Sequence, residues 1–316
     1  MTLVCIRLDK SFGVLRLTAL ADTQASTPRG DGTWRSLQNT TVKLFAIPVR
    51  CYCLDALTPV IGAWTDPYHD TLIGLGFSGS CFEGLTVIAH LQQSLSALVA
   101  PNGDQPLPTK EGIIHLIGKI TEAYFEAHKN KDCSDSPMLQ MIVFGYDAER
   151  PWIGKVSWDK TSRIKSGVEW AGLDTLETIG QDALFRQRAS NWRDAISKHR
   201  SKIEKNSGFK ETVGSKFESK SELANLDTAD KKMIEEEMLL KIESEFATSI
   251  GGVLQKLELS LDSGRVVAAF TRDDRPYLDG ASYSVAPGAH LGPIPLVEKM
   301  GRHIRTSTDA KVNSAS

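Results

Sequence analysis

The sequence lacks the features that mark several large classes of protein. Its 37 lysines and arginines nearly balance 39 aspartates and glutamates, for a net charge of −2 over 316 residues. A dedicated nucleic-acid-binding protein carries a clustered basic excess, so we predict no nucleic-acid partner. The longest apolar stretch, 84–100, is interrupted by His90, Gln92 and Gln93. Because it is too short and too polar to cross a bilayer, we also predict no membrane association.

The cysteines and histidines form no pattern typical of a disulfide framework or a metal site. The five cysteines are irregularly spaced and include no C-x-x-C pair, and the seven histidines include no H-E-x-x-H. We therefore expect reduced thiols and no structural zinc. The first ten residues contain Arg7, Asp9 and Lys10 where a secretory signal must be apolar. These observations predict a cytoplasmic protein.

One glycine pattern resembles a phosphate-binding motif. Gly74, Gly76 and Gly79 fit G-x-G-x-x-G between an expected strand and an expected helix. A dinucleotide-binding unit continues into a second strand with an acidic residue, whereas here the helix leads through Pro101-Asn-Gly-Asp into another helix. Nicotinamide binding is therefore not favoured. Walker A and G-x-S-x-G motifs are both absent from the sequence.

Hydrophobic periodicity predicts an α+β protein in which strands and helices come in blocks. Two antiparallel sheets between two helical layers, a four-layer αββα sandwich, would satisfy this order. We predict one domain over 1–302 with a charged helical insertion at about 180–246, and a disordered tail at 303–316. The insertion is either a solvated surface or a partner-binding surface. Strands are expected at 2–8, 13–21, 40–47, 71–77, 138–146, 152–158, 164–170, 253–261 and 266–270, and helices at 82–100, 109–129 and within 174–246.

The second residue is a candidate nucleophile. Removal of Met1 is usual before so small a residue, and it would leave Thr2 with both a hydroxyl and a free α-amine. Such a residue can perform nucleophilic catalysis alone, because the hydroxyl attacks and the amine accepts its proton. The pKa of an α-amine is about 7.7–8.0, so a nearby lysine ammonium would lower it enough to keep the amine basic near pH 7. An aspartate would hold that lysine in place.

Five segments in the first eighty residues resemble, in their order, a proteasome β-type subunit. The likeness is greatest to the bacterial two-component form, and it covers about 2–172 and 249–272. It implies that Thr2 is the nucleophile, that Asp22 orients Lys43, and that Gly79 supplies the N–H of an oxyanion hole. The segments are Thr2-Leu-Val-Cys-Ile-Arg, Gly13-Val-Leu, Ala21-Asp22-Thr-Gln-Ala-Ser26, Thr41-Val-Lys43-Leu-Phe-Ala-Ile47 and Gly76-Phe-Ser-Gly79-Ser.

The resemblance extends to the residues around this set, with two departures. It implies that Phe77 and Ser78 contact substrate, although Phe77 could instead be a core residue of an apolar strand. The family's G-S-G turn corresponds to 170–174, which has no serine. Its Asp-x-x-Ser-Gly-Gly motif survives only in part, at 245–252. Glu245 and Ser249 could there replace the Asp and Ser of the motif as a pair that supports the nucleophile.

The resemblance predicts an N-terminal-nucleophile hydrolase of the threonine type, cleaving peptide or amide bonds without metal or cofactor. It also implies a homo-oligomeric ring and peptide or protein substrates, and it leaves open whether an ATP-dependent unfoldase is a partner. The alternative is a catalytically inactive, proteasome-like scaffold or binding subunit. As a separate alternative, Asp22 and Lys43 could be an ordinary surface pair, and Gly79 could simply form a tight turn between strand and helix.

Overall fold

The description of the fold rests on a computed structural model. It describes residues 3–11, 14–28, 34–38, 41–53, 67–100, 105–128, 139–159, 163–173, 175–180, 232–240, 254–262, 264–272, 275–278, 281–282, 296–297 and 304–305, with single residues at 187, 191, 194, 198, 199, 201, 242, 250 and 252.

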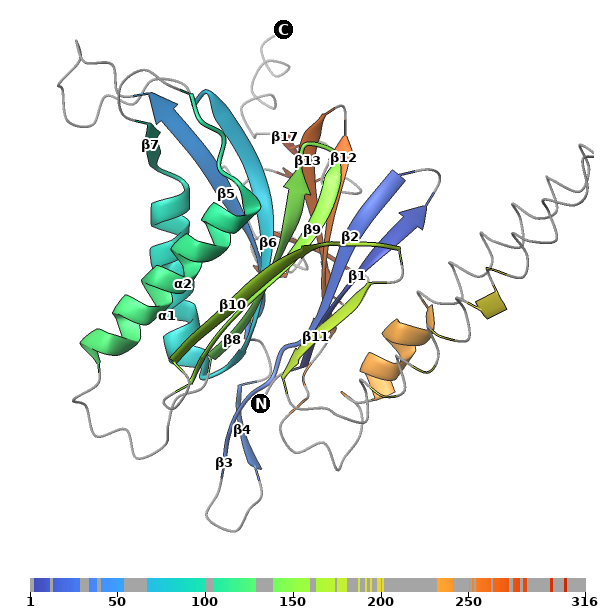
Figure 1. The fold of residues 1–316 in the computed structure, drawn as a ribbon. Helices are drawn as coiled ribbons and strands as arrows, with labels where there is room; N and C mark the ends of the chain where they lie inside the picture. Colours follow the sequence, from blue (N-terminus) through green and yellow to red (C-terminus); the bar gives the residue numbers. More distant parts are fainter. Residues whose placement is uncertain are drawn as a thin grey trace, which may run out of the picture.

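Two mostly antiparallel sheets form the body of the protein (Figure 1). The six-stranded sheet has the order β10-β9-β8-β6-β5-β7, and the seven-stranded sheet has the order β11-β1-β2-β12-β13-β14-β15. Only the pairing of β5 with β7 is parallel among the described pairs. The strands of the first sheet are β5 (Leu44–Cys53), β6 (His69–Gly79), β7 (Leu98–Ala100), β8 (Leu139–Asp147), β9 (Arg150–Asp159) and β10 (Arg163–Trp170); those of the second are β1 (Leu3–Ser11), β2 (Val14–Asp22), β11 (Leu176–Gly180), β12 (Leu254–Asp262), β13 (Arg265–Arg272), β14 (Arg275–Leu278) and β15 (Ala281–Ser282).

Helices α1 (Cys81–Leu95) and α2 (Lys110–Ala127) cover the outer face of the six-stranded sheet (Figure 1). Strand β6 shows why the sheet has two buried faces. Its odd-numbered residues Ile73, Leu75 and Phe77 pack into the core beneath the helices. Its alternate residues face the other sheet, where a Cβ on Gly76 would come within 2.8 Å of Val4 Cγ1. Glycine is therefore required for the close approach of the two sheets at this point.

The outer face of the seven-stranded sheet is covered by a helical segment at 232–240, drawn in orange in Figure 1. Ile234 and Met238 of this segment pack in one buried cluster with Leu3, Cys5 and Leu20. Because β1 alternates, its other side chains, such as Val4 and Ile6, lie in the separate core between the sheets. The order of layers is thus helices, sheet, sheet and helical segment.

The structure confirms the predicted strands and the two helices between them, with local corrections. The side chain of Thr109 accepts a hydrogen bond from Gly112 N at 3.1 Å, so it caps α2 as predicted. The helix predicted over 82–100 ends at Leu95 and is followed by β7. Sequence reasoning also missed β11, because 176–180 was included in a helical region. Two short hairpins, β3 (Ala25–Pro28) with β4 (Trp34–Gln38) and β16 (Leu296–Val297) with β17 (Ile304–Arg305), were not predicted.

Strand β7 explains why the glycine motif does not form a dinucleotide site. It runs parallel to β5, and β5 runs antiparallel to β6. Helix α1 therefore connects two strands of opposite direction, whereas the dinucleotide unit needs parallel strands on both sides of the helix. Among the described helices, none is long and apolar enough to cross a membrane.

Tyr146 of β8 joins the two sheets at the end far from the start of β1. Its hydroxyl lies 2.9 Å from Leu15 O and 3.1 Å from Leu259 O, both in the seven-stranded sheet. Burial raises the pKa of this phenol above its ordinary value, so it remains a donor.

We expect Tyr146→Phe to lower the free energy of unfolding by about 1–1.5 kcal/mol, because two buried carbonyls lose their shared donor. Urea denaturation measures the change, and an unaltered midpoint would contradict it.

Candidate active site

Asp22 ends β2 directly beside the start of β1. The antiparallel register pairs Val4 with Ala21, which brings Leu3 next to Asp22. Leu3 N donates a hydrogen bond to Asp22 Oδ1 at 3.1 Å, and Gln24 N donates one to Oδ2 at 3.2 Å. The Asp22 side chain is fully buried. The carboxylate therefore holds both the first described residue of the chain and the turn after β2.

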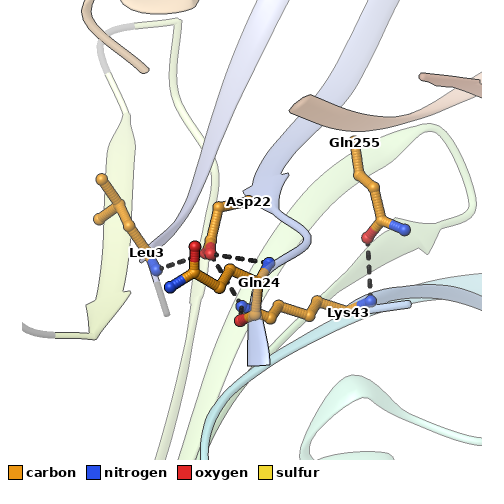
Figure 2. A network of polar contacts seen from close by, with 5 residues as sticks. All are labelled: Leu3, Asp22, Gln24, Lys43 and Gln255. Atoms are coloured by element: carbon orange, nitrogen blue, oxygen red, sulfur yellow. Dashed lines mark hydrogen bonds and ion pairs between the residues drawn. The ribbon is translucent and has the colours of Figure 1, made fainter. Parts of the chain in front are cut away.

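Lys43 reaches the same carboxylate from the other sheet (Figure 2). Its Nζ lies 2.9 Å from Asp22 Oδ2 and 2.5 Å from the main-chain oxygen of Gln24. The lysine is only 2% exposed. The interpretation of Asp22 and Lys43 as a surface pair is therefore wrong: the two form a buried ion pair in which each charged group also has a main-chain partner.

Burial dominates the electrostatics of this ion pair. It lowers the pKa of Lys43 from its ordinary value, while the charge and hydrogen bond of Asp22 act in the opposite direction. The thiol of Cys81, the first residue of α1, lies near enough to interact with Lys43, and burial raises its pKa. A buried ammonium of this kind exerts a strong field on its neighbours, because no solvent screens it. It can therefore shift the pKa of another amine placed beside it.

The main chain of Lys43 is held on both sides. Its N–H donates to Gln255 Oε1 at 2.9 Å, and its C=O accepts a hydrogen bond from Phe77 N at 3.2 Å. Sequence reasoning missed Gln255 because 212 residues separate it from Lys43. It also missed Gln24, which contributes a main-chain atom and so leaves no signal in its residue type.

Gly79 is the last residue of β6 and directly precedes Ser80, the N-cap residue of α1. Its φ of +118° is a conformation that other residues rarely adopt. Since Phe77 N binds Lys43 O, the turn at Gly79 begins two residues from the Lys43 main chain. Gly79 therefore lies two residues along β6 from the contact between this strand and the Lys43 main chain.

The two predicted substrate contacts lie on opposite faces of β6. Phe77 is 1% exposed in the core beneath α1, where a Cβ on Gly84 would meet its ring at 2.6 Å. This is the position of a core residue, the alternative that the sequence left open for it. Ser78 is buried on the other face and pairs across the sheet with Gln140 of β8.

Three predicted site residues, Thr2, Glu245 and Ser249, lie outside the described residues. Ile250, next to Ser249 in the chain, packs in the same cluster as Leu3. The segment that flanks the start of β1 is β11, in which Gly180 pairs with Leu3. Residues 170–173 belong to the stretch that the resemblance matches to the family's G-S-G turn, and they lie at the end of β10 and just after it, at the edge of the other sheet. Within the described residues, no group of three histidine, cysteine, aspartate or glutamate side chains could hold a metal ion.

Comparisons with known proteins find a likeness in structure. No family profile matches the sequence. No curated protein sequence matches it either. A solved structure that matches is "Anbu (ancestral beta-subunit) from Yersinia bercovieri", at 12% sequence identity and a TM-score of 0.42, with 88% of this chain and 89% of that chain covered.

Proposed function

We propose that this protein is an N-terminal-nucleophile hydrolase that cleaves peptide or other amide bonds with Thr2. The observation that carries the proposal is the bridging carboxylate of Asp22. One of its oxygens binds Leu3 N, and the other binds Lys43 Nζ. Leu3 N is the atom to which Thr2 is covalently joined. A buried ammonium is thereby fixed close to the backbone atom that is joined to Thr2, the residue whose α-amine is the proposed base.

The proposed chemistry uses groups of this chain only. Thr2 Oγ attacks the carbonyl carbon of the substrate while its proton passes to the α-amine of the same residue. The Lys43 ammonium lowers the pKa of that amine by like-charge repulsion, so the amine is neutral and basic near pH 7. The N–H of Gly79 stabilises the oxyanion that forms. The amine then gives its proton to the departing nitrogen, and water hydrolyses the acyl ester of Thr2.

Self-association into a ring is part of the proposal. Helix α1 presents apolar side chains to solvent, with Phe82 75% exposed and Leu85 39% exposed. Exposed apolar side chains that lie together are typical of surfaces that contact another protein. Copies of this chain are the proposed partners, and size-exclusion chromatography with light scattering measures their number.

The decisive experiment uses the full chain, intact-mass spectrometry and a β-lactone probe. We expect the protein to lack Met1 and to gain the mass of one probe molecule, which peptide mapping assigns to Thr2. Protein that keeps Met1 would rule out this mechanism. Trimmed, folded protein that takes no label would favour the non-catalytic scaffold, in which the buried ion pair only joins the two sheets.

A further inference from the structure

Two glutamine side chains cross between the sheets at the end where β1 begins. Gln255 lies on β12 of the seven-stranded sheet, and its Oε1 accepts the N–H of Lys43, which leads into β5 of the six-stranded sheet. Gln140 lies on β8 of the six-stranded sheet, and its Oε1 accepts the N–H of Gly180, at the end of β11 of the seven-stranded sheet. Both bonds measure 2.9 Å. The two amides therefore join the same two sheets in opposite directions.

Each glutamine holds one side of the candidate site. Gly180 pairs with Leu3, so Gln140 fixes the strand that flanks the start of β1. Gln255 fixes the main chain of the lysine whose Nζ reaches Asp22, as Figure 2 shows. Both acceptors are uncharged amides. They can hold the backbone here without adding a second negative charge beside the Lys43 ammonium.

We propose that Gln255 and Gln140 are positioning residues that set where the Lys43 ammonium lies relative to the N-terminal residue. The catalytic consequence rests on the proposed hydrolase function, whereas the positioning itself does not. Gln255 is only 5% exposed, so the Lys43 N–H would find no water to replace a lost acceptor. The segment at Lys43 would then shift, and a displacement of about 1 Å can cost about 100-fold in rate.

The first test compares Gln255→Met with Gln255→Glu and Gln92→Met. Methionine keeps the length of the side chain without the acceptor, glutamate keeps an acceptor oxygen, and Gln92 is exposed on α1. We expect Gln255→Met to lower kcat about 10–100-fold with little change in KM, because Gln255 does not touch substrate. The lower pKa in the pH profile should rise, since Lys43 acts less strongly on the amine. Gln255→Glu restores the acceptor but adds a negative charge beside Lys43, so it should recover only part of kcat, and Gln92→Met should match the wild type.

The second test needs no activity. Carbon-13 labelling of lysine side chains reports the titration of Lys43 by NMR. We expect its midpoint to move upward in Gln255→Met, because a displaced side chain becomes more hydrated. A second result is a wild type that does not turn over substrate, together with a Lys43 midpoint that still moves upward in Gln255→Met. That result would refute the hydrolase and support the positioning role. An unchanged midpoint with an unchanged kcat would overturn the proposal. If Gln255→Met does not fold, Gln140→Met, at a half-buried position, carries the same two measurements.

Discussion

Thr2→Ala should abolish hydrolysis and labelling by a β-lactone while leaving the protein folded. The substitution removes the proposed nucleophile but keeps the α-amine, and loss of a nucleophile lowers kcat by more than about 10⁴-fold in a serine protease. Thr2 precedes the first residue of β1, so the pairing of Leu3 with Gly180 and of Val4 with Ala21 does not depend on its side chain. Turnover of a fluorogenic peptide, with circular dichroism as the check on folding, measures the effect.

Thr2→Ser is the matched control for this loss. It keeps a hydroxyl and an α-amine on the same residue, so we expect it to retain labelling and measurable turnover. Turnover by Thr2→Ala at the wild-type rate would place the nucleophile elsewhere in the chain. Activity lost equally in both variants would show that the methyl group or the local fold, and not the hydroxyl, decides the result.

Asp22→Asn should give the largest loss of stability among single substitutions at the site. It leaves the Lys43 ammonium buried without its counter-charge, a change that typically costs about 3–5 kcal/mol. The Asn side chain must also serve Leu3 N and Gln24 N with a single oxygen, where two oxygens now accept them. Guanidinium denaturation at pH 7 measures the loss.

The loss should shrink as the pH rises. Asp22 raises the pKa of Lys43 against the effect of burial, so in Asp22→Asn the folded-state pKa falls further below its ordinary value. The folded variant then releases this proton at a pH where the unfolded chain still binds it. Because the unfolded state holds more protons in that range, the free energy of unfolding rises with pH. We expect Asp22→Asn to lower the free energy of unfolding less at pH 9 than at pH 7. A loss that stays constant or grows with pH would show that the Lys43 ammonium is not the group responsible.

Two further variants isolate the ion pair. In Asp22→Asn/Lys43→Met neither charge of this ion pair remains, so the double variant should lose less stability than the sum of the single variants. Asp70→Asn removes one partner of the Arg50–Asp70 pair, whose side chains are 44% and 50% exposed. We expect this control to change the free energy of unfolding by less than about 1 kcal/mol, because solvent screens such pairs. A comparable loss at Asp70 would show that the effect at Asp22 is not due to burial.

The site could be predicted from the sequence only in part. Asp22, Lys43 and Gly79 came from motifs that lie within the first eighty residues. The structure joins Asp22 and Lys43 in a buried ion pair, and Gly79 lies two residues from the contact of Phe77 N with Lys43 O. Gln255 and Gln140 could not be found in this way, because an amide that accepts a backbone N–H has no local signature. The pairing of β11 with β1 could not be found either, since nothing in the local pattern shows which strand lies beside β1.

The sequence by itself determined helices α1 and α2, most of the core strands and their buried faces. Alternation of apolar residues in β1 and β6, and the apolar periodicity of α1 and α2, specify which side of each element avoids water. Only the tertiary structure decided which strands are neighbours, and therefore that Asp22 and Lys43 share one buried site with Gln255. The physical reason is that periodicity along the chain encodes burial, whereas an ion pair or an amide contact between two sheets depends on how those sheets pack.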